Sequence, residues 1–288
     1  PRREGVVDID GCPISYMEWG DPQSPGIIMI PGLLTTLRCY AFIAPLLADD
    51  YHLVVFDLSG QGDSGQREDY PEAARVQEVM GVARHTGLFD QDEKPFIIAH
   101  SYGATIGLAV LETFSERFGG SIILDMMTMR EDRVKRFRSK RIVGIKKPHR
   151  VNEDLEAVVA KFRLGPPQPC ENTFLLQYIA SHSYREVDGG WIWKFATNIY
   201  NNDYRTDEWW ADQPHRLVRT PGRKVVIHGG LSRLFNQDSI EYLLELGGTD
   251  IPFIKLPEAH HHLMLDQPLA LVAAIRSVLA LWRISRNP

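Results

Sequence analysis

A single serine, Ser101, stands between a run with strand composition and a run with helical spacing. Residues 95–98 are P-F-I-I, and residues 104–111 are mostly small and apolar. Ala99 and Gly103 flank the serine two residues to either side, and such small side chains let a strand and a helix pack closely around a strained turn. Backbone N–H groups at the helix start then face any negative charge that forms beside the hydroxyl. The pattern predicts a nucleophile elbow; the alternative is a buried serine with a structural role.

The rest of the chain alternates between short apolar runs and stretches of helical length. Two strands joined at Asp10-Gly11 are expected over residues 6–19, because this dipeptide is typical of a hairpin turn. Further strands are expected at residues 26–30, 53–56, 95–98, 121–124, 224–227 and 252–254, and helices at residues 38–47, 73–86, 102–116, 239–246 and 268–282. Continuous apolar strands separated by helices predict an α/β fold with a mostly parallel central sheet and helices on both faces.

Residues 130–219 break this alternation. They begin with a run rich in Lys and Arg, continue through a Pro-rich segment and then become rich in aromatic residues. We interpret 130–219 as a mostly helical cap over the carboxyl edge of the sheet, and residues 1–129 and 220–288 as the core. The basic run is interpreted as a solvated helix face, with attraction of an anionic substrate as the alternative. The candidate substrate-binding residues are Trp191 and Trp193 in the cap and His100 beside the elbow.

Composition narrows the partners of this 288-residue chain. Its net charge of −5 argues against nucleic acid or an anionic membrane as the main partner. No apolar run approaches the roughly 18 residues that a membrane span needs. A small-molecule substrate is the expected partner, and nothing in the sequence indicates an oligomeric state. Three widely spaced cysteines fit no metal-binding pattern, and no hydrophobic leader is visible, so we expect a cytoplasmic location and no bound metal.

A serine hydroxyl becomes a strong nucleophile only when a base takes its proton. Three consecutive histidines, His260, His261 and His262, lie between the last predicted strand and the last predicted helix. That position places them at the same edge of the sheet as Ser101. A metal site formed by all three is disfavoured, because consecutive side chains in a loop diverge. The histidine segment is therefore predicted to supply the base.

These motifs together resemble the α/β-hydrolase family, and the resemblance spans nearly the whole chain outside the cap. The family pattern Ala-Gly-His, followed after three residues by an apolar residue, an acid, Gln and Pro, falls on the histidine segment and selects His261 as the base. Residues 57–64 match the family loop D-x-x-G-x-G-x-S, and the turn at residues 31–32 matches its oxyanion loop. The resemblance implies that the backbone N–H groups of Leu33 and Tyr102 form an oxyanion hole.

The acid of the expected triad departs from the common family pattern. Most members carry an Asp in the loop after the strand at residues 224–227, where this chain has Ser232, which cannot hold a charge. A minority place the acid after the strand that follows the elbow helix, where this chain has Asp125. Without a carboxylate the base loses its tautomer lock, so we assign Asp125 as the acid. A strand-end cap is its alternative role, and Asp238 and Asp266 are the fallback acids.

The resemblance implies a serine hydrolase of the carboxylesterase type that works through an acyl-enzyme without a metal or organic cofactor. The aromatic cap favours a small or medium, apolar or aromatic ester. The chain is also similar to cofactor-independent 2,4-dioxygenases of this fold, which open 3-hydroxy-4-quinolone rings with a His–Asp base. Those enzymes carry His in the oxyanion loop, where this chain has Thr35 and Thr36. Carbon–carbon bond hydrolysis, lyase activity and ligand binding are the remaining alternatives.

Overall fold

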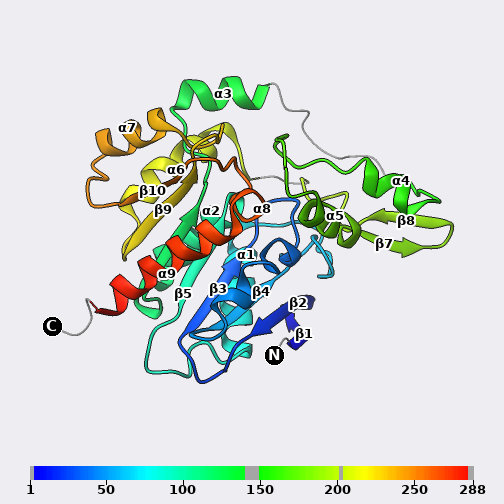
Figure 1. The fold of residues 1–288 in the computed structure, drawn as a ribbon, viewed down its shortest axis with the longest axis horizontal. Helices are drawn as coiled ribbons and strands as arrows, with labels where there is room; N and C mark the ends of the chain where they lie inside the picture. The colour runs from blue at the N-terminus through cyan, green and yellow to red at the C-terminus, as the bar shows by residue number, and fades with distance from the viewer. Residues whose placement is uncertain (1–2, 140–148, 201–203, 285–288) are drawn as a thin grey trace.

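The computed structural model describes residues 3–139, 149–200 and 204–284, and at its centre is an eight-stranded sheet. The strand order is β1-β2-β4-β3-β5-β6-β9-β10; the last six are parallel, and β2 is antiparallel to both β1 and β4. The strands are β1 (Arg3–Ile9), β2 (Cys12–Trp19), β3 (Gly26–Ile30), β4 (His52–Phe56), β5 (Phe96–His100), β6 (Gly120–Leu124), β9 (Lys224–Gly229) and β10 (Phe253–Leu256). The predicted hairpin and the mostly parallel sheet are confirmed (Figure 1).

Helices cover both faces of this sheet. Successive side chains of a strand point to opposite faces, so Ile27 and Met29 of β3 pack with α9, whereas Ile28 and Ile30 pack with α1 and α2. Figure 1 shows α9 crossing in front of the sheet. The main covering helices are α1 (Glu72–His85), α2 (Tyr102–Phe114), α7 (Gln237–Glu245) and α9 (Pro268–Ile284). Among the helices of the described ranges, none is long and apolar enough to cross a membrane.

The helix expected at residues 38–47 is wrong. The structure has two 3-10 helices there, η1 (Leu37–Tyr40) and η2 (Ala44–Leu47). Pro45 stands in the first turn of η2. In a continuous α-helix Pro45 would have no N–H to donate to the Ala41 carbonyl and its ring would clash with that carbonyl, so the chain forms two short 3-10 helices instead.

The range that we interpret as the cap, residues 130–219, combines helices with a small hairpin. Its elements are α3 (Glu131–Ser139), α4 (Leu155–Ala160), α5 (Thr173–His182), β7 (Tyr184–Val187), β8 (Gly190–Trp193) and α6 (Asp207–Arg219). In Figure 1, α4, α5 and the hairpin lie together to one side of the sheet. The expected mostly helical cap omitted the hairpin, which turns at Gly189, where φ is +82°. Its alternating W-I-W strand fits the β-propensity of aromatic and branched residues.

The described part of the basic run is an exposed, ion-paired surface. Arg130 pairs with Glu245 and Asp238, and Arg133 also pairs with Asp238. Part of the run, residues 140–148, lies outside the described residues. Exposed pairs of this kind contribute little to stability, because water and salt screen the attraction between the charges.

Helix α6 lies within the sequence range assigned to the cap but packs on the core. Leu217 is fully buried in the same apolar cluster as α1 and α2. Arg216 donates to both carboxylate oxygens of Glu72 at 2.7 and 2.9 Å, and to Glu112 at 2.6 Å. This charged contact ties α6 to α1 and α2, which carry those two glutamates.

Candidate active site

The turn at Ser101 has the geometry that its neighbours predict. It connects β5 to α2 with φ +55° and ψ −120°, a strained backbone conformation for a residue with a side chain. A Cβ at Gly103 would lie 2.4 Å from the Pro31 carbonyl oxygen, so only glycine fits this crossing of helix and strand. The Ser101 N–H donates to the Leu124 carbonyl at 2.9 Å, which fixes the turn against β6. The predicted strand–serine–helix unit is confirmed.

Residues far apart in the chain form a continuous hydrogen-bond chain from Ser101. The Ser101 Oγ lies 3.0 Å from Nε2 of His261, and Nδ1 of the same ring lies 2.8 Å from Oδ1 of Asp125. The His261 side chain is almost fully buried, and that of Asp125 is completely buried. A neutral imidazole that donates from Nδ1 to a carboxylate presents the Nε2 lone pair to the hydroxyl. The arrangement can therefore remove the hydroxyl proton and store it on the ring.

Two further donors hold the carboxylate of Asp125. The Gly229 N–H donates to Oδ2 at 2.8 Å, and the Ser232 hydroxyl donates to Oδ1 at 2.6 Å. Burial raises the pKa of Asp125 to about 7, and these two hydrogen bonds oppose the rise by stabilising the anion. Ser232, at the place where most of the family has an acid, thus supports the carboxylate that β6 provides.

The two fallback acids lie in other interactions. Asp238 pairs with Arg130 and Arg133 on the surface. Asp266 accepts the backbone N–H of His260 at 2.6 Å. Among the described residues, Asp125 is the candidate acid whose carboxylate is hydrogen-bonded to the His261 ring.

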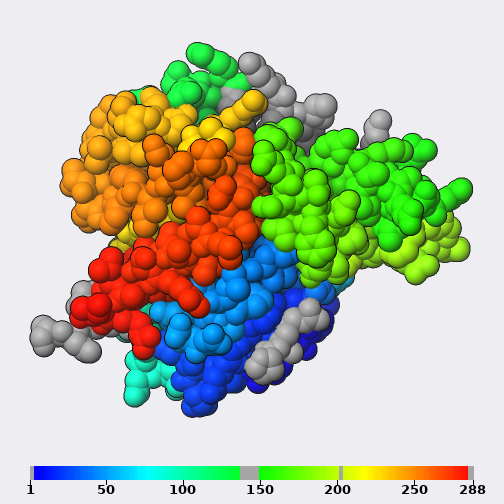
Figure 2. Space-filling model, viewed as in Figure 1, coloured from blue at the N-terminus to red at the C-terminus, as the bar shows by residue number. Residues whose placement is uncertain are grey.

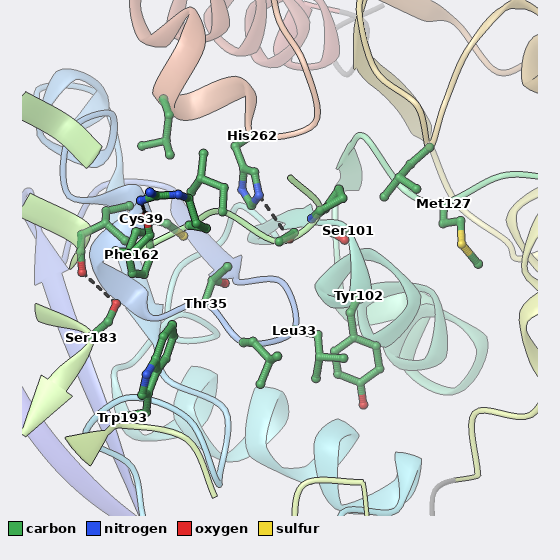
Figure 3. A pocket seen from close by; sticks show the side chains of 18 of the residues that line it. Leu33, Thr35, Cys39, Ser101, Tyr102, Met127, Phe162, Ser183, Trp193 and His262 are labelled. Atoms are coloured by element: carbon green, nitrogen blue, oxygen red, sulfur yellow. Dashed lines mark hydrogen bonds between the residues drawn. The ribbon is translucent and has the colours of Figure 1, made fainter. Parts of the chain in front are cut away.

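The segment that follows β3 is shaped by a buried glutamine. The side chain of Gln61 accepts the Leu34 N–H at 2.6 Å and donates to the Gly32 carbonyl at 3.3 Å. Leu33, between them, lines a cavity together with Ser101 and Tyr102 (Figure 3). The Tyr102 N–H belongs to the first turn of α2, whose N–H groups have no partner within the helix. Both proposed oxyanion donors therefore belong to residues beside the serine.

The side chain of Tyr102 points away from the serine toward the cap. Its hydroxyl is 2.8 Å from that of Tyr204, and the guanidinium of Arg205 lies 5.0 Å from its ring centre. In Figure 3 the ring extends away from Ser101. The backbone N–H, rather than the phenol, is therefore the group of Tyr102 that can serve the reaction.

A cavity of about 360 Å³ opens on Ser101 between the core and the cap. Phe162 and Trp193 form one wall, with ring centres 5.9 Å apart and planes inclined by 21°. Arg163 is the one residue with a permanent charge among those described as lining it. The lining residues are Leu33, Leu34, Thr35, Cys39, Ser101, Tyr102, Met127, Phe162, Arg163, Leu164, Gly165, Pro166, Ile179, Ser183, Trp193, Tyr200, Trp210, Leu234, His262 and Leu265. This lining suits a mostly apolar ligand of modest size.

Of the three candidate substrate-binding residues, Trp193 lines the cavity and the other two lie outside its lining. Trp191 is two residues nearer the hairpin tip, which displaces it by about 6.6 Å along the strand. His100 is 1% exposed, and its Nε2 donates to the His261 carbonyl at 2.9 Å. Burial lowers the pKa of His100 to about 3, so its ring is neutral. Of the three candidates, Trp193 therefore lies on the cavity, and His100 and Trp191 are not among the residues that line it.

The sequence reasoning missed Gln61, Phe162 and His262. Gln61 lies between the two glycines of the motif at residues 57–64. This position in the motif is the sequence signal that could have indicated a role for Gln61. His262 lines the cavity and its Nε2 donates to the Gly165 carbonyl at 3.2 Å. In the described residues, no group of three or more His, Cys, Asp or Glu side chains could hold a metal ion. His260 and His262 turn away from Asp125 toward different partners.

Sequence comparison shows the family to which the chain belongs. The sequence profile of the alpha/beta hydrolase family matches residues 27–275. A 1H-3-hydroxy-4-oxoquinoline 2,4-dioxygenase of Pseudomonas putida is 23% identical over 282 residues, covering 95% of this chain and 98% of that protein. The hydrolase YugF of Bacillus subtilis, which is uncharacterised, is 24% identical over 118 residues, or 40% of this chain and 42% of that protein.

Solved structures share the fold over nearly the whole chain. An E-2-(acetamidomethylene)succinate hydrolase has a TM-score of 0.80 at 17% identity, covering 97% of this chain and 100% of that one. A thioesterase domain from the curacin biosynthetic pathway has a TM-score of 0.77 at 19% identity, covering 96% and 99%. At these identities the likeness shows the fold, and function has to be argued from the site.

Proposed function

We propose that this chain, which belongs to the α/β-hydrolase family, is a serine hydrolase of the carboxylesterase type. One observation carries the proposal. Ser101 lines the cavity with its Oγ 3.0 Å from Nε2 of His261, whose Nδ1 lies 2.8 Å from the buried carboxylate of Asp125. This is the arrangement that activates a hydroxyl for attack on a carbonyl carbon.

The proposed reaction has two halves. The Ser101 Oγ attacks the ester carbonyl while its proton passes to Nε2 of His261, and the N–H groups of Leu33 and Tyr102 hold the oxyanion. The carbon–oxygen bond to the alcohol then breaks, and the ring gives its proton to the departing alcohol. In the second half, His261 takes a proton from water, the hydroxide attacks the acyl group, and Ser101 leaves with that proton. Asp125 stays ionised and stabilises the imidazolium in both halves.

The cavity lining favours esters with an apolar or aromatic group, so Trp193→Ala tests the substrate class. Loss of one aromatic wall is expected to weaken binding of an aromatic ester by about 1.4 kcal/mol, which is a tenfold change in affinity. We expect KM for 4-nitrophenyl phenylacetate to rise about tenfold, and KM for the much smaller acetate ester to stay within twofold. Trp191→Ala, in the same strand but outside the lining, is the matched control. Equal losses for both variants, or for both esters, would contradict a specific wall at Trp193.

The environment of Asp125 predicts a change in pH dependence for Ser232→Ala. The Ser232 hydrogen bond lowers the pKa of this carboxyl, so its removal raises the pKa further. Because the ionised form is needed, the acidic limb of the kcat/KM profile should move to higher pH by about one unit. Profiles of kcat/KM from pH 5 to 9 would measure this shift. The control is Ser239→Ala, because the Ser239 hydroxyl donates to the Thr128 carbonyl. An unmoved limb would show that Ser232 does not tune the acid.

A cofactor-independent 2,4-dioxygenase is the second candidate function. The observation that favours it is the full-length match to the Pseudomonas putida dioxygenase, together with an acid at Asp125. Here the His261–Asp125 pair would take the hydroxyl proton of the substrate, and the resulting anion would react directly with O₂. Thr35 and Thr36, in place of the oxyanion-loop histidine of that group, argue against it.

Side-by-side assays separate the two functions. The protein is incubated with 4-nitrophenyl butyrate while nitrophenolate is followed, and with 1H-3-hydroxy-4-oxoquinoline while O₂ uptake is followed. The proposal expects ester turnover without O₂ uptake. Consumption of O₂ by the quinolone, with no ester turnover, would reject the hydrolase assignment and support the dioxygenase.

A further inference from the structure

A Pro-rich segment of the cap lies against the loop that carries His261. We define the cap strap as residues 165–172 and the histidine loop as residues 260–266. Figure 2 shows the green residues of the cap packed against the orange-red residues of the C-terminal part of the core. Asn172 donates to the Leu265 carbonyl at 2.6 Å, so hydrogen bonds as well as packing join the two segments.

The backbone around His261 is held on three sides. The His260 N–H donates to Asp266 at 2.6 Å, and the His262 N–H donates to the side-chain oxygen of Gln168 at 3.0 Å. The carbonyl of His261 itself accepts from Nε2 of His100 at 2.9 Å. The peptide group after His261 is therefore held at both its C=O and its N–H, and the peptide group before His260 is held at its N–H, each by a side chain from another position.

Gln168 joins two of these three contacts. While its oxygen accepts the His262 N–H, its nitrogen donates to both carboxylate oxygens of Asp266 at 3.2 and 3.1 Å. Hydrogen bonds to a charged acceptor are stronger than neutral ones, and the Asp266 side chain is only 6% exposed. One amide from the cap thus braces the backbone on both sides of His261. Gln168 is not among the residues that line the cavity.

We propose that Gln168 is a positioning residue, through which the cap strap sets the place of the His261 ring relative to Ser101. The inference rests on the proposed role of His261 as the base. A displacement of about 1 Å in a reacting group can cost about a hundredfold in rate. Gln168 therefore completes the catalytic geometry, whereas Gly165 and Pro166 of the same strap line the cavity.

Gln168→Leu tests this role, because it removes all three hydrogen bonds of the Gln168 amide and keeps a side chain of similar size. We expect kcat for 4-nitrophenyl butyrate to fall about 10- to 100-fold, with KM within twofold of the parent. The matched control is Asn172→Leu, which cuts the contacts of the same strap to the carbonyls of Leu265 and Asp266 and leaves the peptide groups beside His261 intact. Its kcat should stay within about threefold.

A second readout does not depend on which reaction the protein performs. The His261 Nδ1–H that donates to Asp125 gives a downfield proton NMR signal, which should shift or broaden in Gln168→Leu and persist in Asn172→Leu. Gln168→Glu, which keeps the acceptor and places a carboxylate beside Asp266, should change the signal too, and it serves if the Leu variant does not fold. The inference would be overturned if Gln168→Leu left both the signal and kcat unchanged, or if it changed KM alone. It would also be overturned if Asn172→Leu lowered kcat as much as Gln168→Leu does. If the parent forms no acyl-enzyme, the proposed function fails, and the signal still tests the positioning role.

Discussion

Replacing Ser101 with alanine is expected to abolish ester hydrolysis, with kcat falling by about 10⁴- to 10⁶-fold. The hydroxyl is the atom group that forms the acyl bond in the proposed mechanism, and no neighbouring side chain can take over its position at the start of α2. The measurement is steady-state release of nitrophenolate from 4-nitrophenyl butyrate by the variant and the parent. Circular dichroism would confirm that the variant is folded.

Ser183→Ala is the control for this substitution. Ser183 also lines the cavity, but its hydroxyl donates to the Ile179 carbonyl at 2.7 Å. Its turnover should remain within about threefold of the parent, because it makes no bond to the reacting atoms. Ester turnover that survives in Ser101→Ala would show that another group is the nucleophile. Substantial quinolone cleavage by the same variant would favour the dioxygenase, in which the serine does not attack.

Replacing Asp125 with asparagine is expected to lower kcat by about 10⁴-fold. An amide in this position has no charge to stabilise the imidazolium, and its NH₂ group can present a donor to Nδ1, which favours the wrong tautomer of His261. Gly229 and Ser232 would also lose their anionic acceptor. The pH profile and kcat for 4-nitrophenyl butyrate are the quantities to measure.

Asp238→Asn is the matched control for this change. It alters an acid that was considered for the same role but pairs with Arg130 and Arg133 at the surface. Near-normal turnover in Asp125→Asn, or an equal loss in Asp238→Asn, would refute the assignment of the acid. Restoration of activity by adding Ser232→Asp to Asp125→Asn would support it further, because Ser232 Oγ lies only 2.6 Å from the carboxylate.

Local patterns in the sequence were enough to predict much of the fold. Apolar runs bounded by turn residues located the strands of the sheet, because a strand buried on both faces must be apolar throughout. The elbow was predictable because Ala99 and Gly103 are the residue types that a close crossing demands, and the structure leaves no space for a Cβ at Gly103.

The site required information that local patterns do not contain. Ser101 and His261 are separated by 160 residues, and the choice among three adjacent histidines came from the family pattern. The support of Asp125 by Ser232 depends on how β6 and β9 lie side by side. Gln168 was visible only as part of a Pro-rich run, because nothing in that run shows which loop it contacts.

Cap residues were the least predictable for the same reason. Trp191 and Trp193 are the same residue type in the same strand. Only the position of the hairpin relative to the core decides which of them reaches the cavity. His100 is next to Ser101 in the chain, yet its side chain turns into the protein and bonds to the backbone of His261. Proximity in sequence to a candidate nucleophile is therefore a poor guide to contact with substrate.

A rapid-mixing experiment with 4-nitrophenyl butyrate, followed by acid quenching and mass spectrometry, shows directly whether Ser101 is the nucleophile. We expect a pre-steady-state release of nitrophenolate, together with one butyryl group attached to the peptide that contains Ser101. Both should be absent in Ser101→Ala. Ester turnover with no acyl group on Ser101 would show that Ser101 is not the nucleophile. O₂ uptake with 1H-3-hydroxy-4-oxoquinoline and no ester turnover would show that the protein is not a hydrolase.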